Sequence, residues 1–410
     1  MLDGDLAEAG RATVRAIAED IAQLPRERRR PADEALFWAY VAGTFDDPDT
    51  TSRFEAAITA FHERLEMPFS SLGLYNGLAG AGWVLAHISD DSANEALEEI
   101  DRALIDGLGA PWAGGHDLIQ GLTGLGVYFL ERLRTGAATA RAGVACVVEQ
   151  LAATAEARPE GATWLTPPEQ LPAWQRVWAP AGHYDVGVAH GAPGAIALLA
   201  AVAVLEGPEL ASTAGQARAL CEGAGRWLQK QRLAPDPRGW FPTTIPRDPR
   251  VPERARTAWC YGDPGVAIAM WSAAVRTGTD PAEWRELALE AAARPAAQCG
   301  VEDAGLCHGA VGLAHLCNRF FQASGDERFR RASLAWFEQA LAMRRPGEGI
   351  GGFTVPRWID VARGQPPVRE AAADFLEGGI GIGLALLAGL AAEEPGWDRL
   401  LLCDLPPRQP

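Results

Sequence analysis

The chain has 410 residues, of which 48% are hydrophobic, so it can bury a large core. Its formal net charge of −16 argues against nucleic acid as a partner, because binding a phosphate backbone requires a basic surface. The acidic start, Met1–Asp5, is not a signal peptide, and the longest apolar runs fall short of the roughly 20 residues of a membrane span. We therefore expect a cytoplasmic protein without a membrane span.

The N-terminal part of the chain has helical periodicity in two segments. Residues Asp5–Ile21 and Phe54–Leu65 place apolar side chains three and four positions apart, which predicts two amphipathic helices. Between them, the basic run Arg26–Arg30 is more typical of a solvated linker than of a peptide-binding patch.

A glycine-rich motif then recurs six times, and each copy opens an apolar run that is typical of a buried helix. Charged, amphipathic segments such as Pro281–Ala297 and Glu327–Met343 follow these runs as second helices. The first glycines are Gly77, Gly121, Gly191, Gly262, Gly309 and Gly378.

The spacing of the glycines indicates a repeated helical hairpin. Steps of about 45 residues fit one hairpin, and steps of about 70 residues fit a hairpin with about 25 additional loop residues. The additional residues form Pro- and aromatic-rich segments at Arg158–His183, Ala234–Ala255 and Arg345–Ala371. Six copies can close a ring, so we predict an all-α protein, an α/α toroid with inner and outer helices. We expect a single domain, 1–410, in which residues 1–70 complete the ring and residues 71–392 form the six repeats.

Nucleotide binding is a weaker interpretation of these glycines. A dinucleotide-binding unit requires a strand before its glycines, but the residues before each copy show no strand-like alternation. No copy ends in Gly-Lys-Ser/Thr, which excludes the phosphate-binding loop. Glycines three apart at a helix start instead leave a flat face for close approach of neighbouring helices and allow the preceding loop to turn sharply.

In a repeat of hairpins, the residues before each first glycine share one end of the barrel. Cys260 precedes the fourth glycine, and Cys307 and His308 precede the fifth. Two sulfurs and one nitrogen suit a tetrahedral zinc site whose fourth position is open, as in catalytic sites. The odd count of seven cysteines also favours metal ligands or buried thiols over disulfides in a cytosolic chain. Alternatively, Cys260 and Cys307 are small buried hydrophobic residues.

Further candidates lie in the same loops. In the third copy, His190 stands at the position that His308 has in the fifth. We interpret it as a general acid or base, although a lone histidine is also common in protein cores. Asp117, four residues before Gly121, would orient His190. Arg256, four residues before Cys260, would stabilise negative charge that develops on oxygen. Taken alone, either residue would be a surface charge.

These motifs resemble those of the lanthipeptide cyclases, the LanC-like family. The family's marks appear in order as Ala189–Gly191, Trp259–Gly265 and Cys307–Gly312, within a resemblance that runs from about Ser71 to Leu390. The resemblance implies an α/α toroid with zinc held by two cysteines and a histidine. It also implies the roles by position: zinc ligands Cys260, Cys307 and His308, and catalytic residues Asp117, His190, Arg256 and Tyr261. The step from Gly77 to Gly121 is too short for the β-rich domain that some members carry, so we expect none here.

The reaction implied by the resemblance is Michael-type addition of a cysteine thiol to dehydroalanine or dehydrobutyrine in a dehydrated precursor peptide, which forms a thioether ring. A lanthipeptide dehydratase is the partner that would supply this peptide. Three other functions remain open: addition of glutathione to dehydrated residues, a non-catalytic peptide-binding scaffold, and a glycoside hydrolase using Asp117, Asp263 and Glu377. The hydrolase leaves the cysteines unexplained.

Overall fold

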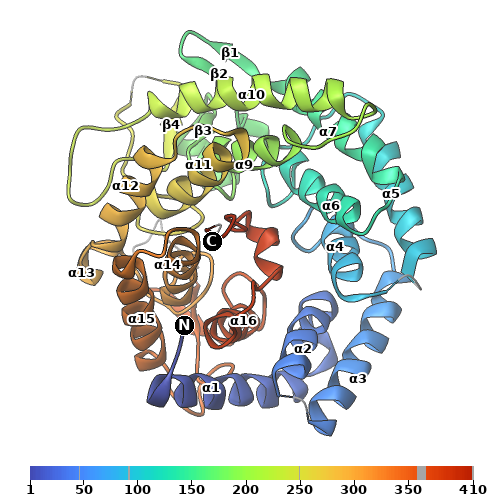
Figure 1. Ribbon diagram of the computed structural model, residues 1–410, viewed down its shortest axis with the longest axis vertical. Helices are drawn as coiled ribbons and strands as arrows, with labels where there is room; N and C mark the ends of the chain where they lie inside the picture. The colour runs from blue at the N-terminus through green and yellow to red at the C-terminus, as the bar shows by residue number, and fades with distance from the viewer. Residues whose placement is uncertain (46, 91–92, 249, 358–365, 409–410) are drawn as a thin grey trace. The chain divides into compact units, whose positions relative to one another are not determined.

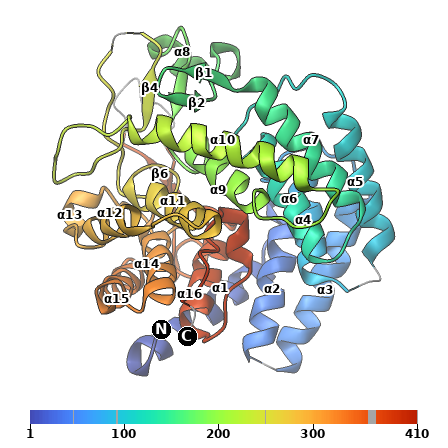
Figure 2. The ribbon, with the colours of Figure 1, turned by 45° about the horizontal axis from the view of Figure 1, so that its top comes forward.

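The structure, a computed structural model, describes residues 1–45, 47–90, 93–248, 250–357 and 366–408. Most of these residues lie in helices, and the strands are short (Figures 1 and 2). The chain folds into two compact units. Unit 1 comprises Met1–Pro68, Ala292–Trp397 and Pro407–Pro410, and unit 2 comprises Phe69–Ala291 and Asp398–Pro406. The all-α class is confirmed, whereas the single-domain organisation stays a prediction.

Unit 1 is built on pairs of helices. Helix α14 packs on α15 and α2 packs on α3, while α16 packs against α1, α2 and α14. A short antiparallel hairpin, β5–β6, follows α15. The elements are α1 (Gly4–Ala22), α2 (Pro31–Phe45), α3 (Pro48–Leu65), α13 (Ala296–Cys299), α14 (Ala310–Ser324), α15 (Glu327–Ala342), β5 (Val355–Arg357), β6 (Val368–Glu370) and α16 (Gly379–Leu390).

Unit 2 repeats the same scheme. Helix α9 packs on α10 and α11, and α6 packs on α7 (Figure 2). Strands β1 and β2 form an antiparallel hairpin, whereas β3 and β4 come from two different insertions and pair as a two-stranded antiparallel sheet. The elements are α4 (Leu78–Ile88), α5 (Asn94–Leu108), α6 (Leu122–Arg134), α7 (Thr139–Thr154), β1 (Glu156–Arg158), β2 (Gly161–Thr163), α8 (Ala173–Trp178), β3 (His183–Asp185), α9 (Ala192–Val202), α10 (Ala211–Gln229), β4 (Thr244–Pro246), α11 (Asp263–Thr277) and α12 (Ala282–Ala292).

All six predicted inner helices begin at the recurring glycines, and they are almost entirely buried. In each copy, the glycine three residues after the first one has a different role from the one we expected. It lies against the backbone of its own preceding loop: a Cβ atom on Gly312 would stand 2.0 Å from the carbonyl oxygen of Leu306, and one on Gly80 would stand 1.8 Å from that of Leu74. Close approach to neighbouring helices is instead the role of the glycine two residues further along, in the copies that have one, as at Gly383, which faces the ring of Phe37. Helix and loop therefore form one tight unit in each copy.

The loops that precede the glycines are joined by backbone hydrogen bonds. In unit 2, the amide of Tyr75 donates to Ile119, that of Leu118 to Ala189, and that of Ala189 to Cys260. In unit 1, the amide of Cys307 donates to Leu376, at 2.8 Å. Within each unit, successive loops thus lie side by side, as the repeat predicted.

Other expectations needed correction. Helix α2 was not predicted, because its apolar residues are spread around the helix and give no clear periodic stripe. Helix α3 begins earlier than expected, at Pro48, where the side chain of Asp47 caps the amide of Thr50. The predicted outer helix over 281–297 ends at Ala292 and resumes after Pro295 as α13. Part of the predicted insertion over 345–371, residues 358–365, lies outside the described residues. No helix among the described residues has both the length and the apolar character needed to cross a membrane.

Candidate active site

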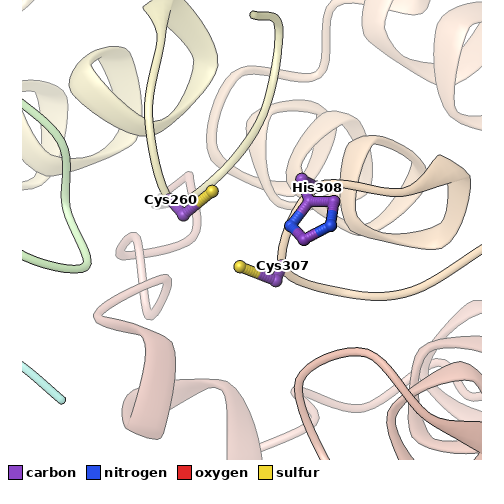
Figure 3. Close-up of side chains that lie close together, drawn as sticks. All are labelled: Cys260, Cys307 and His308. Atoms are coloured by element: carbon purple, nitrogen blue, oxygen red, sulfur yellow. The ribbon is translucent and has the colours of Figure 1, made fainter. Parts of the chain in front are cut away.

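The three predicted metal ligands lie close together (Figure 3). The sulfurs of Cys260 and Cys307 and a ring nitrogen of His308 all lie within 4.8 Å of one another. Cys260 is buried, and the other two residues are partly exposed. Within the part of the chain that the structure describes, this is the one group of three or more His, Cys, Asp or Glu side chains close enough to share an ion. The donor set of two sulfurs and one nitrogen fits zinc.

Each donor is held by the loop that carries it. The carbonyl oxygen of Cys260 accepts the amide of Ala189, and the neighbouring Trp259 donates its indole N–H to the carbonyl of Leu401, at 2.9 Å. Cys307 is fixed through its own amide to Leu376. The imidazole Nε2 of His308 lies 3.6 Å from a carboxylate oxygen of Asp303.

His190 and Asp117 form a pair, as predicted. His190 Nδ1 lies 3.6 Å from Asp117 Oδ1, and this oxygen also accepts the amides of Ile119 and Gln120 at 2.7 and 2.9 Å. Burial alone would lower the pKa of His190, but Asp117 raises it, with smaller contributions from Asp185 and Cys260. Burial would likewise raise the pKa of Asp117, but His190 and the Gln120 amide lower it. The pair therefore favours an imidazolium beside a carboxylate.

Tyr261 contacts both His190 and a second carboxylate. Its ring stacks on that of His190, with centroids 6.1 Å apart, and its hydroxyl donates to Asp185 Oδ1 at 2.7 Å. Burial and the nearby Asp185 charge raise the pKa of Tyr261 well above its ordinary value, so the hydroxyl stays protonated. The ring thus supports His190, while the hydroxyl is engaged by Asp185.

Asp185 itself was missed by the sequence analysis. It is 4% exposed, accepts a hydrogen bond from the hydroxyl of Thr166 and lies 3.2 Å from Nε2 of His183. Burial would raise its pKa, but His183 and Thr166 hold it below the ordinary range. A signal existed in the sequence: Asp185 stands six residues before Gly191, and Asp303 stands six before Gly309.

Two remaining candidates are placed differently. Arg256 is exposed, and its side chain forms no ion pair within the described part of the chain. Asp263, a carboxylate considered for glycoside hydrolysis, is buried at the start of α11 and accepts the backbone amides of Trp240 and Phe241. Because these hydrogen bonds occupy the carboxylate of Asp263, it is a poor candidate for the acid or base of a glycoside hydrolase.

Comparisons with known proteins agree with this arrangement. A family model described as lanthionine synthetase C-like protein matches residues 34–402. Nisin biosynthesis protein NisC from Lactococcus lactis subsp. lactis is 22% identical over 307 residues, which are 68% of this chain and 71% of NisC. A solved nisin cyclase shares the fold with a TM-score of 0.69 and 18% identity, covering 95% of this chain and 97% of that one. This likeness confirms the predicted α/α-toroid fold class.

Proposed function

Because the chain belongs to the lanthionine synthetase C-like family, we propose that it is a zinc-dependent lanthipeptide cyclase. It would add cysteine thiols to dehydroalanine or dehydrobutyrine in a dehydrated precursor peptide and so form thioether rings. The convergence of Cys260, Cys307 and His308 is the observation that carries the proposal. The names of the similar nisin proteins support the same chemistry.

The three ligands suit a zinc ion with a free coordination position for the substrate. A free thiol has a pKa of about 8.5 and is mostly protonated at neutral pH, and a zinc ion would supply the Lewis acidity that keeps it deprotonated. Two cysteine ligands make the site electron-rich, which favours a nucleophilic sulfur.

His190 and Asp117 would manage the proton. In the overall addition, the thiol S–H bond and the C=C π bond break, the sulfur bonds to the β-carbon of the dehydro residue, and the α-carbon gains a proton, which balances the proton that the thiol releases. An imidazolium on His190, stabilised by Asp117, is a suitable donor to the α-carbon of the enolate. Tyr261 would keep the His190 ring in place by stacking on it.

Arg256 is the candidate to stabilise the enolate oxygen. Its exposed side chain can reach a peptide substrate, whereas the Tyr261 hydroxyl already donates to Asp185. The dehydrated peptide must come from a reaction that eliminates water from serine or threonine, so a lanthipeptide dehydratase is the expected partner.

The test uses purified protein and a dehydrated precursor peptide. Ring formation leaves the peptide mass unchanged but removes free thiols, so alkylation followed by mass spectrometry counts the rings. We expect stoichiometric zinc and ring formation in the wild type, and loss of both in Cys307→Ala. Cys146→Ala, which changes a cysteine on α7 outside the cluster, is the matched control.

Two outcomes would contradict this proposal. A zinc-free wild type, or a Cys307→Ala variant with full ring-forming activity, would remove its basis. Adding glutathione to the same reactions separates the neighbouring function, because an intermolecular product gains the mass of glutathione.

A further inference from the structure

The third and fifth loops share one pattern, Asp-x-Gly-x-x-His-Gly, but use it differently. In the third loop, Asp185 turns to Tyr261 and Thr166, and His190 takes its carboxylate partner, Asp117, from the second loop. In the fifth loop, Asp303 instead faces the histidine of its own loop, His308. The same pattern thus gives different contacts in the two loops, so the contact between Asp303 and His308 does not follow from the repeat alone.

Asp303 is fixed by the start of α14. It is 4% exposed, and its Oδ1 accepts the amide of Gly305 at 2.8 Å. Its carbonyl oxygen accepts the amide of Ala310 at 3.0 Å, and a Cβ atom on Gly309 would stand only 2.4 Å from Oδ1. With Oδ1 held in this way, Oδ2 is directed at His308 Nε2, 3.6 Å away.

A second carboxylate lies near the same nitrogen, at a slightly greater distance. Glu377 Oε1 is 3.8 Å from His308 Nε2. Glu377 is more exposed than Asp303 and forms an ion pair with Arg357, which offsets its charge. Asp303 is therefore the main negative charge acting on this side of the ring.

We propose that Asp303 is a positioning residue that holds the imidazole proton of His308 on Nε2, so that Nδ1 binds the metal. A carboxylate stabilises an N–H group that faces it, and the other ring nitrogen then keeps its lone pair for an ion. Figure 3 shows a ring nitrogen of His308 on the side of the two sulfurs, as this assignment requires. The inference rests on the proposed zinc site and adds to it the residue that prepares the nitrogen ligand.

The substitution Asp303→Asn tests the idea with little change of shape. The amide oxygen can still accept the Gly305 N–H, which leaves the amide NH₂ facing His308 Nε2. An N–H donor there favours the tautomer with its proton on Nδ1, which is the wrong one for binding. We expect zinc affinity, measured by competition with a chelator, to fall roughly 10- to 100-fold. The thermal unfolding midpoint of the zinc-free protein should stay near that of the wild type.

Two further variants separate this effect from a general loss of charge. Glu302→Gln removes the charge of an exposed neighbour in the same loop and should leave zinc affinity unchanged. Glu377→Gln should reduce the affinity less than Asp303→Asn does, because Arg357 already offsets the charge of Glu377.

Nitrogen NMR of the zinc-loaded wild type gives an independent readout. With ¹⁵N-labelled histidine, and His308 assigned by its absence in His308→Gln, we expect a protonated Nε2 and a metal-bound Nδ1. The opposite assignment, or an Asp303→Asn variant that binds zinc as tightly as the wild type, would overturn the inference and leave the proposed function intact. A wild type that binds no zinc would overturn both.

Discussion

At the scale of single residues, the ion pair of Glu131 with Arg399 sets the behaviour of unit 2 in acid. Arg399 forms two hydrogen bonds of 2.7 Å with this buried carboxylate, and His87 lies 2.9 Å from it. Burial alone would raise the pKa of Glu131, but the bonds to His87 and Arg399 lower it to about 2 from an ordinary value of 4.5. Because the folded protein has the lower pKa, this interaction stabilises it fully only above the unfolded value.

We therefore predict an acid-dependent loss of stability between about pH 4.5 and pH 2. The contribution lost is about 3 kcal/mol, since each pKa unit corresponds to about 1.4 kcal/mol. Urea denaturation at several pH values should show this slope in the wild type and a flatter one in Glu131→Gln. Glu99→Gln, at an exposed carboxylate on α5, is the control. Equal slopes in all three proteins would contradict the assignment.

The sequence predicted that residues come together where residue type and spacing carry the signal. Cys260, Cys307 and His308 stand beside the glycines, so the repeat alone placed them at one end of the helices. Asp185 and Asp303 were missed, because their importance depends on distances to side chains that only the folded loop sets. Asp185, for example, bonds to Tyr261, which is far away in the sequence.

At the scale of elements, the glycine three residues after the first glycine of each copy joins an inner helix to its loop. In the fifth copy, α14 begins so close to the loop that a Cβ atom on Gly312 would touch the Leu306 carbonyl. We predict that Gly312→Ala displaces the loop and lowers the free energy of unfolding by about 1–3 kcal/mol. Zinc affinity should fall as well, because Cys307 and His308 belong to that loop.

The matched control is Gly215→Ala on α10. A Cβ atom there meets nothing within 4 Å, so alanine should stabilise the protein by about 0.5–1 kcal/mol. Urea denaturation and chelator competition measure both variants. If Gly312→Ala proves as stable as the wild type and binds zinc equally well, the helix start does not control the loop.

The elements themselves were predictable where the signal was local. All six inner helices were placed correctly by their glycines, and α15 began at the expected residue, Glu327. The prediction failed for α2, which buries residues around much of its circumference, including Glu34, and for the break at Pro295. In both cases tertiary packing or a single proline outweighs periodicity.

At the scale of the whole molecule, the last part of the chain completes unit 2. Residues Asp398–Pro406 belong to that unit, although more than a hundred residues separate them from the rest of it. The carbonyl of Leu400 accepts the hydroxyl of Tyr75, and that of Leu401 accepts the indole of Trp259, next to Cys260. Five apolar side chains of the segment are buried: Leu400, Leu401, Leu402, Cys403 and Leu405.

We predict that a chain ending at Trp397 does not fold. Each buried leucine contributes about 1.5–3 kcal/mol, so the loss approaches the 5–15 kcal/mol of net stability that is usual for a domain. A chain ending at Pro406 keeps the segment and is the control. Circular dichroism and thermal melting decide the outcome, and a native melting transition in the shorter chain would contradict the prediction. No local sequence pattern predicted that residues 398–406 stabilise unit 2, because this contribution depends on long-range packing.

The hydrogen bonds between neighbouring loops fix the residues before each glycine, whereas the segments between the helices can vary in length. The extra segments after α7, α10 and α15 change the length of a repeat but lie outside the six residues that precede each glycine. A change in the length of these segments therefore leaves the backbone hydrogen bonds between neighbouring loops in register, so the segments can be lengthened without moving the loops that carry Cys260, Cys307 and His308.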